Sequence, residues 1–156
     1  MRQARGFTLI ELLVVLAIMG ILAMSAVPLA QVERKRSREA ELRSSLRTLR
    51  GAIDAYRKSW SEGHIEKKPD DSGYPPNLQV LVDGVVDASD PKGRRLYFLR
   101  RIPRDPFADA QLPAEQTWAL RSYDSPADAP AAGRDVYDVM SVAAGTGLDG
   151  VPYRQW

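Results

Sequence analysis

The first 60 residues contain two stretches with different hydrophobic patterns. From Leu12 to Val32 the chain runs for 21 residues without a charge. From residue 42 onward, apolar residues recur at alternating spacings of four and three, which forms one stripe on a charged helix: Leu42, Leu46, Leu49, Ile53, Tyr56 and Trp60. We therefore predict a long helix from Phe7 to about Trp60, with a first half long enough to cross a bilayer and an amphipathic second half.

Two features of this helix leave alternatives open. Pro28 removes a backbone donor, so it either kinks the helix or ends a membrane helix that a loop then follows. The apolar stripe either packs on the protein's own sheet or forms a coiled coil, but it covers fewer than three heptads, which favours the sheet. No stripe is present in residues 34–39, so this stretch is expected to emerge from the domain.

After Trp60 the pattern changes to loops and short strands. Glycines and prolines end the helical pattern, and residues 77–82 indicate a short helix capped by Asn77, with a strand as the alternative. Residues 117–122 and 135–141 alternate like half-buried strands, whereas the prolines between residues 102 and 106 exclude a central strand there. The expected fold class is α+β: a long helix packed on a small antiparallel sheet with extensive loops.

Composition narrows the classes of function. The 156 residues leave room for about one small domain beyond the apolar stretch, and the absence of cysteine excludes disulfides and thiolate metal sites. Residues 33–68 carry a net charge of +5 and residues 69–156 a net charge of −4. The basic residues of the first segment alternate with acids beside an apolar anchor, which favours a solvated or subunit-facing helix over a nucleic-acid site.

Catalytic motifs are missing from the sequence. The single histidine, His64, lies in a polar loop, and no nucleophile elbow, phosphate-binding loop or zinc-protease motif occurs. The neighbouring acids Asp70 and Asp71 lie in a Pro/Gly-rich loop, where a solvated turn is expected more often than an acid–base pair. We therefore do not expect an enzyme.

Glu11 is the candidate functional residue of the apolar stretch. An ionised carboxylate in the middle of a bilayer costs about 2.5–3.5 kcal/mol, so such an acid is expected to have a specific partner. An ordinary secretory signal peptide is the alternative, with Arg2 and Arg5 as its basic region. That alternative explains neither Glu11 nor an apolar run longer than the roughly 7–15 residues of a signal core.

The segment Arg5–Leu12, with the sequence RGFTLIEL, resembles the N-terminus of type IV pilin-like proteins. The resemblance implies a leader of residues 1–6, cleavage between Gly6 and Phe7, and N-methylation of Phe7. It further implies that residues 7–32 form the transmembrane and assembly helix, in which Glu11 meets the terminal amine of a neighbouring subunit. Pro28 matches a proline near which the helices of this superfamily melt in filaments.

Later segments resemble one branch of this superfamily, the major pseudopilins of type II secretion systems. The matching segments are residues 73–75, 78–82, 102–107 and 137–141, in the same order as in that family. The resemblance implies a filament subunit that promotes export of folded proteins. It also implies three kinds of partner: other pseudopilins, a prepilin peptidase and an inner-membrane assembly platform.

The resemblance also places residues 33–156 in the periplasm, beyond a single inner-membrane span. Basic residues on both sides of the apolar stretch oppose this orientation, because Arg34, Lys35, Arg36 and Arg38 would by themselves keep the C-terminal part in the cytoplasm. Two functional alternatives stay open. One is a pilin of a type IV pilus or a minor pseudopilin, and the other is a membrane-tethered binding module that never polymerises.

Members of this branch hold calcium in a C-terminal loop, through Asp carboxylates and backbone carbonyls. This chain departs from that pattern, because the corresponding tail retains one acid, Asp149, and turn chemistry favours a turn at the Asp149-Gly150 pair over a calcium ligand. Asp138 and Asp135 are further candidate ligands, although solvated strand-edge positions account for them more simply. The aromatic residues Tyr153 and Trp156 are expected either at an interface or folded onto the core.

Overall fold

The computed structural model describes residues 6–156, apart from the side chains of residues 23–29. The chain divides into two compact units, Met1–Ser37 and Arg38–Trp156, and each is described by itself. The predicted boundary between residues 32 and 33 lies five residues before this division, and the leader and anchor limits stay predictions.

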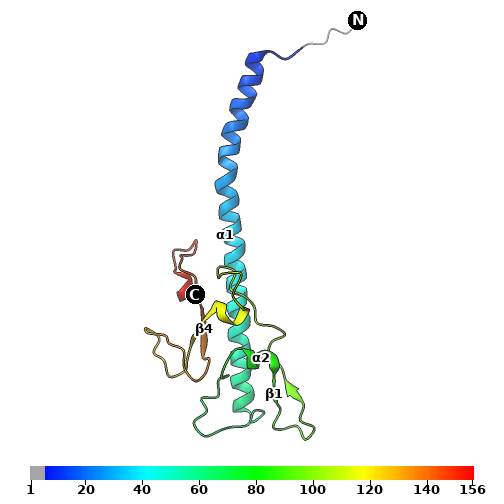
Figure 1. Ribbon diagram of the computed structural model, residues 1–156, viewed down its shortest axis with the longest axis vertical. Coiled ribbons are helices and arrows are strands. Elements are labelled where there is room, and N and C mark those ends of the chain that lie inside the picture. Colours follow the sequence, from blue (N-terminus) through cyan, green and yellow to red (C-terminus); the bar gives the residue numbers. More distant parts are fainter. Residues whose placement is uncertain (1–5) are drawn as a thin grey trace. The chain divides into compact units, whose positions relative to one another are not determined.

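Helix α1 runs from Leu9 to Ser61 and belongs to both units (Figure 1). The predicted helix over residues 7–60 is thus confirmed to within two residues at its start and one at its end. The interpretation in which a loop follows Pro28 is wrong, because α1 includes that position. The Pro28 side chain lies outside the described residues, and the predicted kink stays a prediction.

The apolar stripe of α1 forms the core of the second unit. Leu42, Leu49 and Ile53 are at most 1% exposed, and Trp60 packs at the margin of the same cluster. The residues that cover the stripe come from later in the chain: Ile65, Leu78, Leu81, Trp118, Val136, Val139 and Tyr153. Because burial of each large aliphatic side chain contributes about 1.5–3 kcal/mol, this stripe supplies a large part of the domain's stability. The coiled-coil alternative is therefore wrong.

A short helix and a hairpin follow the first long loop. Helix α2 spans Gln79–Asp83, and the Asn77 side chain accepts a hydrogen bond from the Val80 N–H at 3.0 Å, as the capping prediction requires. Strands β1 (Val85–Val86) and β2 (Arg95–Leu96) pair antiparallel. This hairpin was missed, since two-residue strands carry no recognisable alternation.

The second sheet joins β3 (Trp118–Arg121), which follows the 3-10 helix η1 (Ala114–Thr117), to β4 (Asp138–Ser141). They pair antiparallel, with Trp118 opposite Ser141 and Arg121 opposite Asp138. The small antiparallel sheet is thus two separate two-stranded sheets, which lie on different sides of the domain part of α1 (Figure 1). The predicted strand over residues 135–141 begins three residues too early.

The chain after β4 returns to α1. Residues 142–156, here called the C-terminal segment, contain a bridge between Thr146 and Pro152 and the 3-10 helix η2 (Tyr153–Gln155). Tyr153 is buried, with its ring stacked on Phe107 at 4.4 Å between centroids, and Trp156 contacts it edge-on. The two aromatic residues are therefore folded onto the domain's own core.

Candidate assembly surface

The predicted processing and assembly residues lie at the start of α1. Gly6 and Phe7 precede the helix and are exposed, Phe7 by 79%. Glu11 and Thr8 form a reciprocal cap: the Glu11 N–H donates to the Thr8 hydroxyl at 3.3 Å, and the Thr8 N–H donates to the Glu11 carboxylate at 3.4 Å. Glu11 thus has a local structural role in the single chain, in addition to its predicted role between subunits.

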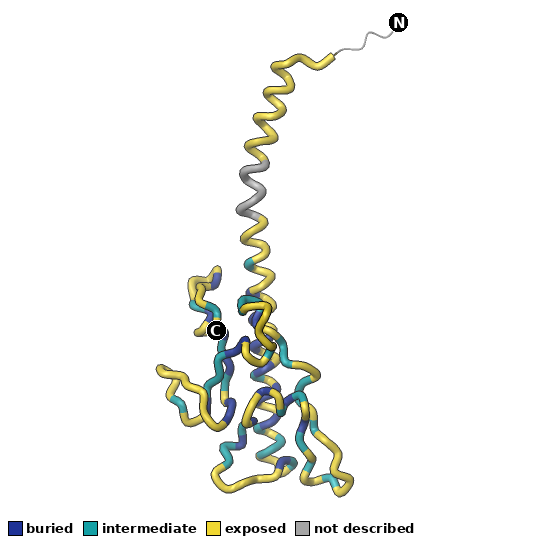
Figure 2. The backbone as a smooth tube through the Cα atoms, in the orientation of Figure 1, coloured by how far each residue is buried: buried dark blue, intermediate teal, exposed yellow. Residues whose placement is uncertain are grey.

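An apolar surface extends from Phe7, just before α1, along the first part of that helix. We call it the α1 apolar surface and define it by side chains that are 47–79% exposed: Phe7, Leu9, Ile10, Leu12, Leu13, Val14, Val15, Leu16, Ile18, Met19, Ile21 and Leu22. Figure 2 shows the contrast with the domain part of α1, where exposed and buried positions alternate. A contiguous exposed patch of large apolar residues marks a site of contact with lipid or protein.

Within the described residues, no helix meets the length and hydropathy expected of a membrane span.

The three candidate calcium ligands are each engaged by different groups. Asp149 Oδ2 accepts a hydrogen bond from Arg43 at 2.8 Å, and its Oδ1 accepts one from the Val151 N–H at 3.0 Å, which closes a turn. Asp138 Oδ1 pairs with Arg50 at 2.8 Å. Among the residues that the structure describes, no three His, Cys, Asp or Glu side chains come together in a group that could hold a metal ion. As a set, these acids do not fit the calcium arrangement that the resemblance implies.

Asp135 is the acid whose position differs most from expectation. It is only 4% exposed and lies before β4, so the solvated strand-edge interpretation is wrong for this residue. Burial would raise the pKa of Asp135, but hydrogen bonds from Ser72, the Tyr123 N–H and Ser122 outweigh it and hold the pKa below its usual value. Asp135 therefore holds the loop before β4 against the end of β3.

Two buried acids were missed by the sequence interpretation. Glu39 is 4% exposed and accepts hydrogen bonds from the Leu148 N–H and the Tyr153 hydroxyl. Asp105 is 2% exposed and accepts from the Ser141 hydroxyl and the Phe107 N–H. The sequence could have indicated that Glu39 is buried, because it lies three residues before Leu42 and so continues the spacing of the apolar stripe.

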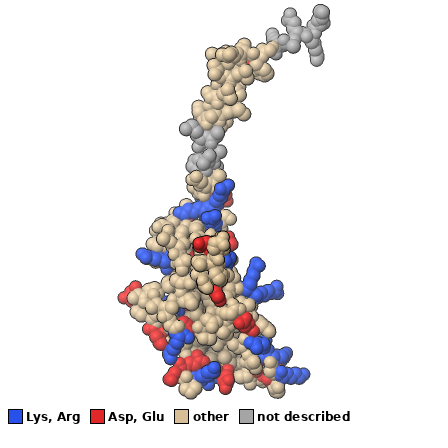
Figure 3. Space-filling model, viewed as in Figure 1, with Lys and Arg blue, Asp and Glu red and all other residues tan. Residues whose placement is uncertain are grey.

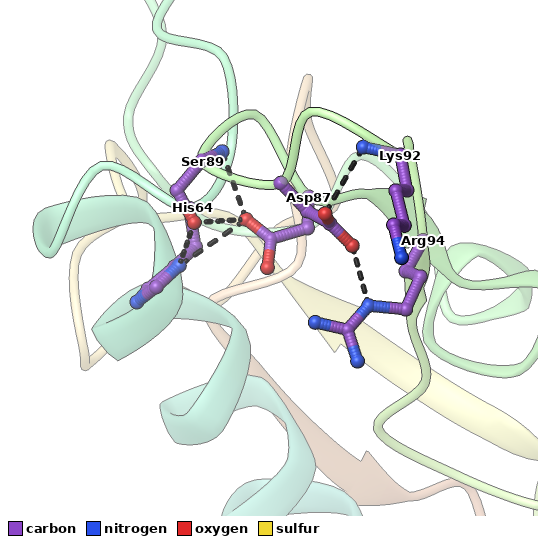
Figure 4. Close-up of polar contacts among 6 residues, drawn as sticks. His64, Asp87, Ser89, Lys92 and Arg94 are labelled. Carbon is purple, nitrogen blue, oxygen red and sulfur yellow. Dashed lines mark hydrogen bonds and ion pairs between the residues drawn. The ribbon is translucent and has the colours of Figure 1, made fainter.

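His64 forms a polar cluster that superficially resembles a catalytic triad (Figure 4). Its Nδ1 lies 3.2 Å from Asp87 Oδ1 and 2.9 Å from the Ser89 hydroxyl, and that hydroxyl also donates directly to Asp87 at 2.6 Å. In a triad the serine and the acid occupy different imidazole nitrogens, so that a proton passes through the ring. Here both contact the same nitrogen, and the hydrogen bonds from Ser89 hold the pKa of Asp87 below its usual value. The arrangement ties His64 to the loop that connects β1 and β2.

Charge on the domain surface is mixed. Figure 3 shows Lys and Arg side chains interspersed with Asp and Glu on the face in view, without one basic patch. This distribution agrees with a solvated surface rather than a nucleic-acid site.

Comparisons with known proteins match both the start of the chain and most of its length. Residues 1–27 match the prokaryotic N-terminal methylation motif. Over 119 residues the chain is 34% identical to type II secretion system core protein G of Klebsiella pneumoniae, which covers 72% of this chain and 76% of that protein. The chain belongs to the family of type II secretion system core protein G. It is therefore a pseudopilin, and the resemblance found in its sequence is confirmed.

Other members of the family support the same assignment at similar sequence identity. Core protein G of Dickeya chrysanthemi is 33% identical over 116 residues, which cover 71% of this chain and 69% of that protein. The Vibrio cholerae protein is 30% identical over 112 residues, with 70% and 69% covered. No solved structure matched the chain. Membership in this family points to the role of a structural subunit rather than to catalysis.

Proposed function

We propose that the chain is a main-body subunit of a type II secretion pseudopilus. A prepilin peptidase cleaves it between Gly6 and Phe7, and Phe7 is then N-methylated. Residues 7–32 cross the inner membrane and bind other subunits, while residues 33–156 form a periplasmic domain. The filament, built on an inner-membrane assembly platform with other pseudopilins, promotes export of folded proteins.

The α1 apolar surface is the observation that carries this proposal. About a dozen large apolar side chains of one helix are exposed in the single chain, and they begin directly after the proposed cleavage point. Membrane lipid covers such a surface before assembly, and neighbouring subunits cover it afterwards. The match of residues 1–27 to the methylation motif supports cleavage at the same place.

Glu11 is proposed to pair with the amine of Phe7 on a neighbouring subunit. Among the residues that the structure describes, its carboxylate accepts one long hydrogen bond, from the Thr8 N–H at 3.4 Å. Such a bond is weak, so the carboxylate can exchange it for a charged partner at little cost.

A pilin of a type IV pilus and a minor pseudopilin are the alternatives within the same class. The chain's similarity to several core G proteins favours the main-body subunit. A membrane-tethered binding module that never polymerises is the alternative from a different class, and it assigns no task to Glu11 beyond capping the helix.

Intact-mass analysis of the protein from its native host tests the processing step. We expect a mass that lacks residues 1–6 and includes one added methyl group. A protein that retains Met1, or one cleaved near Ala26 as an ordinary signal peptide would be, contradicts the proposal.

Deletion of the gene in the native host tests the secretion step. We expect a group of folded proteins to disappear from the culture medium and to accumulate in the periplasm, and plasmid-borne wild-type protein to restore their export. Loss of surface pili with an unchanged set of exported proteins would instead favour the type IV pilus alternative.

A further inference from the structure

Three residues on one face of α1 hold the C-terminal segment. Glu39, Arg43 and Arg50 are separated by four and seven residues, so they follow one another along the same side of the helix. All three belong to the second unit, as does the segment that they contact. Together with their contacts, these residues are here called the α1 clasp.

Arg50 donates hydrogen bonds to three oxygen atoms from two separate places in the chain. Its Nε donates to Asp138 Oδ1 at 2.8 Å, and its Nη2 donates to the main-chain oxygens of Val139 at 3.1 Å and Trp156 at 2.7 Å. One side chain thus joins α1, β4 and the end of the C-terminal segment. A guanidinium group suits this task because its donors are fixed in a planar fork.

Arg43 and Glu39 hold the middle of the same segment. Arg43 pairs with Asp149 at 2.8 Å, and its guanidinium lies 4.1 Å from the centre of the Trp156 ring. Glu39 is buried and accepts from the Leu148 N–H at 2.9 Å and from the Tyr153 hydroxyl at 3.0 Å. The turn between these contacts is tight, since a side chain at position 147 would meet both Asp149 and Trp156 within 2.5 Å.

The oxygens that Arg50 gathers are of the same kinds that calcium takes in proteins. Calcium is bound by carboxylate and carbonyl oxygens, and it organises a loop by drawing them to one point. Arg50 draws one side-chain carboxylate and two main-chain oxygens together, while Arg43 pairs with Asp149, the one acidic side chain of the tail. A divalent cation at Asp138 or Asp149 would also face the like charge of a guanidinium less than 3 Å from the carboxylate oxygen.

We propose that the guanidinium groups of Arg43 and Arg50 replace a structural cation in this chain, so that the C-terminal segment is held to α1 without calcium. The proposal concerns the stability of the domain and does not depend on how the subunit assembles. It follows from the positions that the two arginines occupy beside the acids that a calcium site would need.

Hydrogen–deuterium exchange of the full chain in detergent micelles tests this proposal. Exchange of residues 142–156 is measured by mass spectrometry in millimolar calcium and in chelator, for the wild-type chain and for Arg50→Gln, Arg43→Gln and Arg47→Gln. Arg47 is exposed on the same helix between the two clasp arginines, so its variant is the matched control for loss of one positive charge.

We expect the wild-type segment to exchange at the same rate with calcium and with chelator. Arg50→Gln should accelerate its exchange by about 10-fold or more, because it removes charged hydrogen bonds to three acceptors. Arg43→Gln should accelerate it by about 3-fold, since this pair is nearly half exposed, and Arg47→Gln should have no effect.

Two results would overturn the proposal. One is a wild-type segment that loses its protection in chelator, and the other is a segment that Arg50→Gln and Arg43→Gln leave unchanged. If Arg50→Gln fails to fold, Asp138→Asn provides the same test, because it keeps the shape of the side chain while removing the charge that Arg50 binds. Unchanged exchange in Asp138→Asn would then count against the clasp.

Discussion

The two ends of α1 use hydrophobic residues in opposite ways. Near its start, residues such as Leu13 and Leu16 are 57% and 64% exposed, whereas Leu42 and Leu49 in the second unit have no exposed surface. Leucine and isoleucine occur in both stretches, but Leu12–Val32 has no charged residue, whereas the second stretch places its apolar residues in one stripe between charges. Apolar residues on all sides leave a helix without a partner in its own chain, while a single stripe with charged flanks lets the domain fold around it.

The two stretches of α1 therefore have different roles. The second stretch stabilises a domain, and the first provides a surface that lipid or other subunits must cover. Substitutions of the same chemical type should therefore affect folding in one stretch and leave it unchanged in the other.

The largest expected effect is on the folding of the domain. Leu49→Ala should lower the free energy of unfolding by about 2–5 kcal/mol, because it leaves a cavity under a side chain with no exposed surface. Leu13→Ala is the matched control in the first stretch and should leave unfolding unchanged. Chemical denaturation of the full chain in detergent, followed by near-UV circular dichroism, measures both. Equal effects of the two variants would remove the distinction between the stretches.

A second substitution locates the point where the two stretches meet. Glu39→Ala removes the acceptor for the Leu148 N–H and the Tyr153 hydroxyl, and we expect a loss of about 1.5–3 kcal/mol. Glu33→Ala, six residues earlier and exposed, should change stability by less than about 0.5 kcal/mol. If the Glu33 variant were as destabilised as the Glu39 variant, the folded domain would extend further toward the apolar surface than its contacts indicate.

Tyr153 should make the stability of the domain sensitive to alkaline pH. Burial, and then the hydrogen bond and charge of Glu39, raise the pKa of Tyr153 to about 12 from an unfolded value near 10. The folded state therefore holds this proton more tightly, and the resulting stability is complete below about pH 10 and lost as the pH rises toward 12. Unfolding experiments should show Tyr153→Phe less stable than wild type at neutral pH, with the difference shrinking across that range. A constant difference up to pH 12 would contradict this account.

The smallest effect is expected at the exposed charges of α1. Lys58 and Glu62 lie 3.9 Å apart, and Lys58 is 74% exposed. Lys58→Ala should change the free energy of unfolding by less than about 0.5 kcal/mol. A loss of several times that amount would show that surface charge, as well as the apolar stripe, determines the stability of this helix.

Much of the fold could be predicted because it depends on local patterns. The helix and its buried face follow from periodicity alone, and Asn77 caps α2 by a contact three residues away. The β1–β2 hairpin and the late start of β4 could not be predicted, since their strands are short and their positions depend on pairing between distant residues. Asp135 illustrates the point, because its partners Ser122 and Tyr123 become visible only once β3 and β4 have paired.

The residues proposed for processing and assembly lie close together in the sequence, whereas the acids proposed for calcium have distant partners. Gly6, Phe7 and Glu11 lie within one short motif, so the sequence alone nominates them, and their roles in processing and assembly stay predictions. Asp149 was proposed as a calcium ligand by its position in the tail, and Asp138 as a further acid in the preceding strand, but their partners Arg43 and Arg50 are 106 and 88 residues away along the chain. No local pattern connects a helix arginine with an acid over such a separation.

The central claim is that the charge of Glu11 serves assembly through the apolar stretch of α1. Two variants separate this role from helix capping. Glu11→Gln keeps an acceptor for the Thr8 N–H but removes the charge, whereas Thr8→Ala removes the capping hydroxyl and keeps the charge.

Filament formation in the native host, measured by sedimentation and electron microscopy, tests the claim most directly. We expect Glu11→Gln to abolish filaments while the unfolding of the domain stays as in wild type, and Thr8→Ala to assemble. Normal filaments from Glu11→Gln would contradict the account, and so would a loss of filaments in Thr8→Ala as complete as in Glu11→Gln.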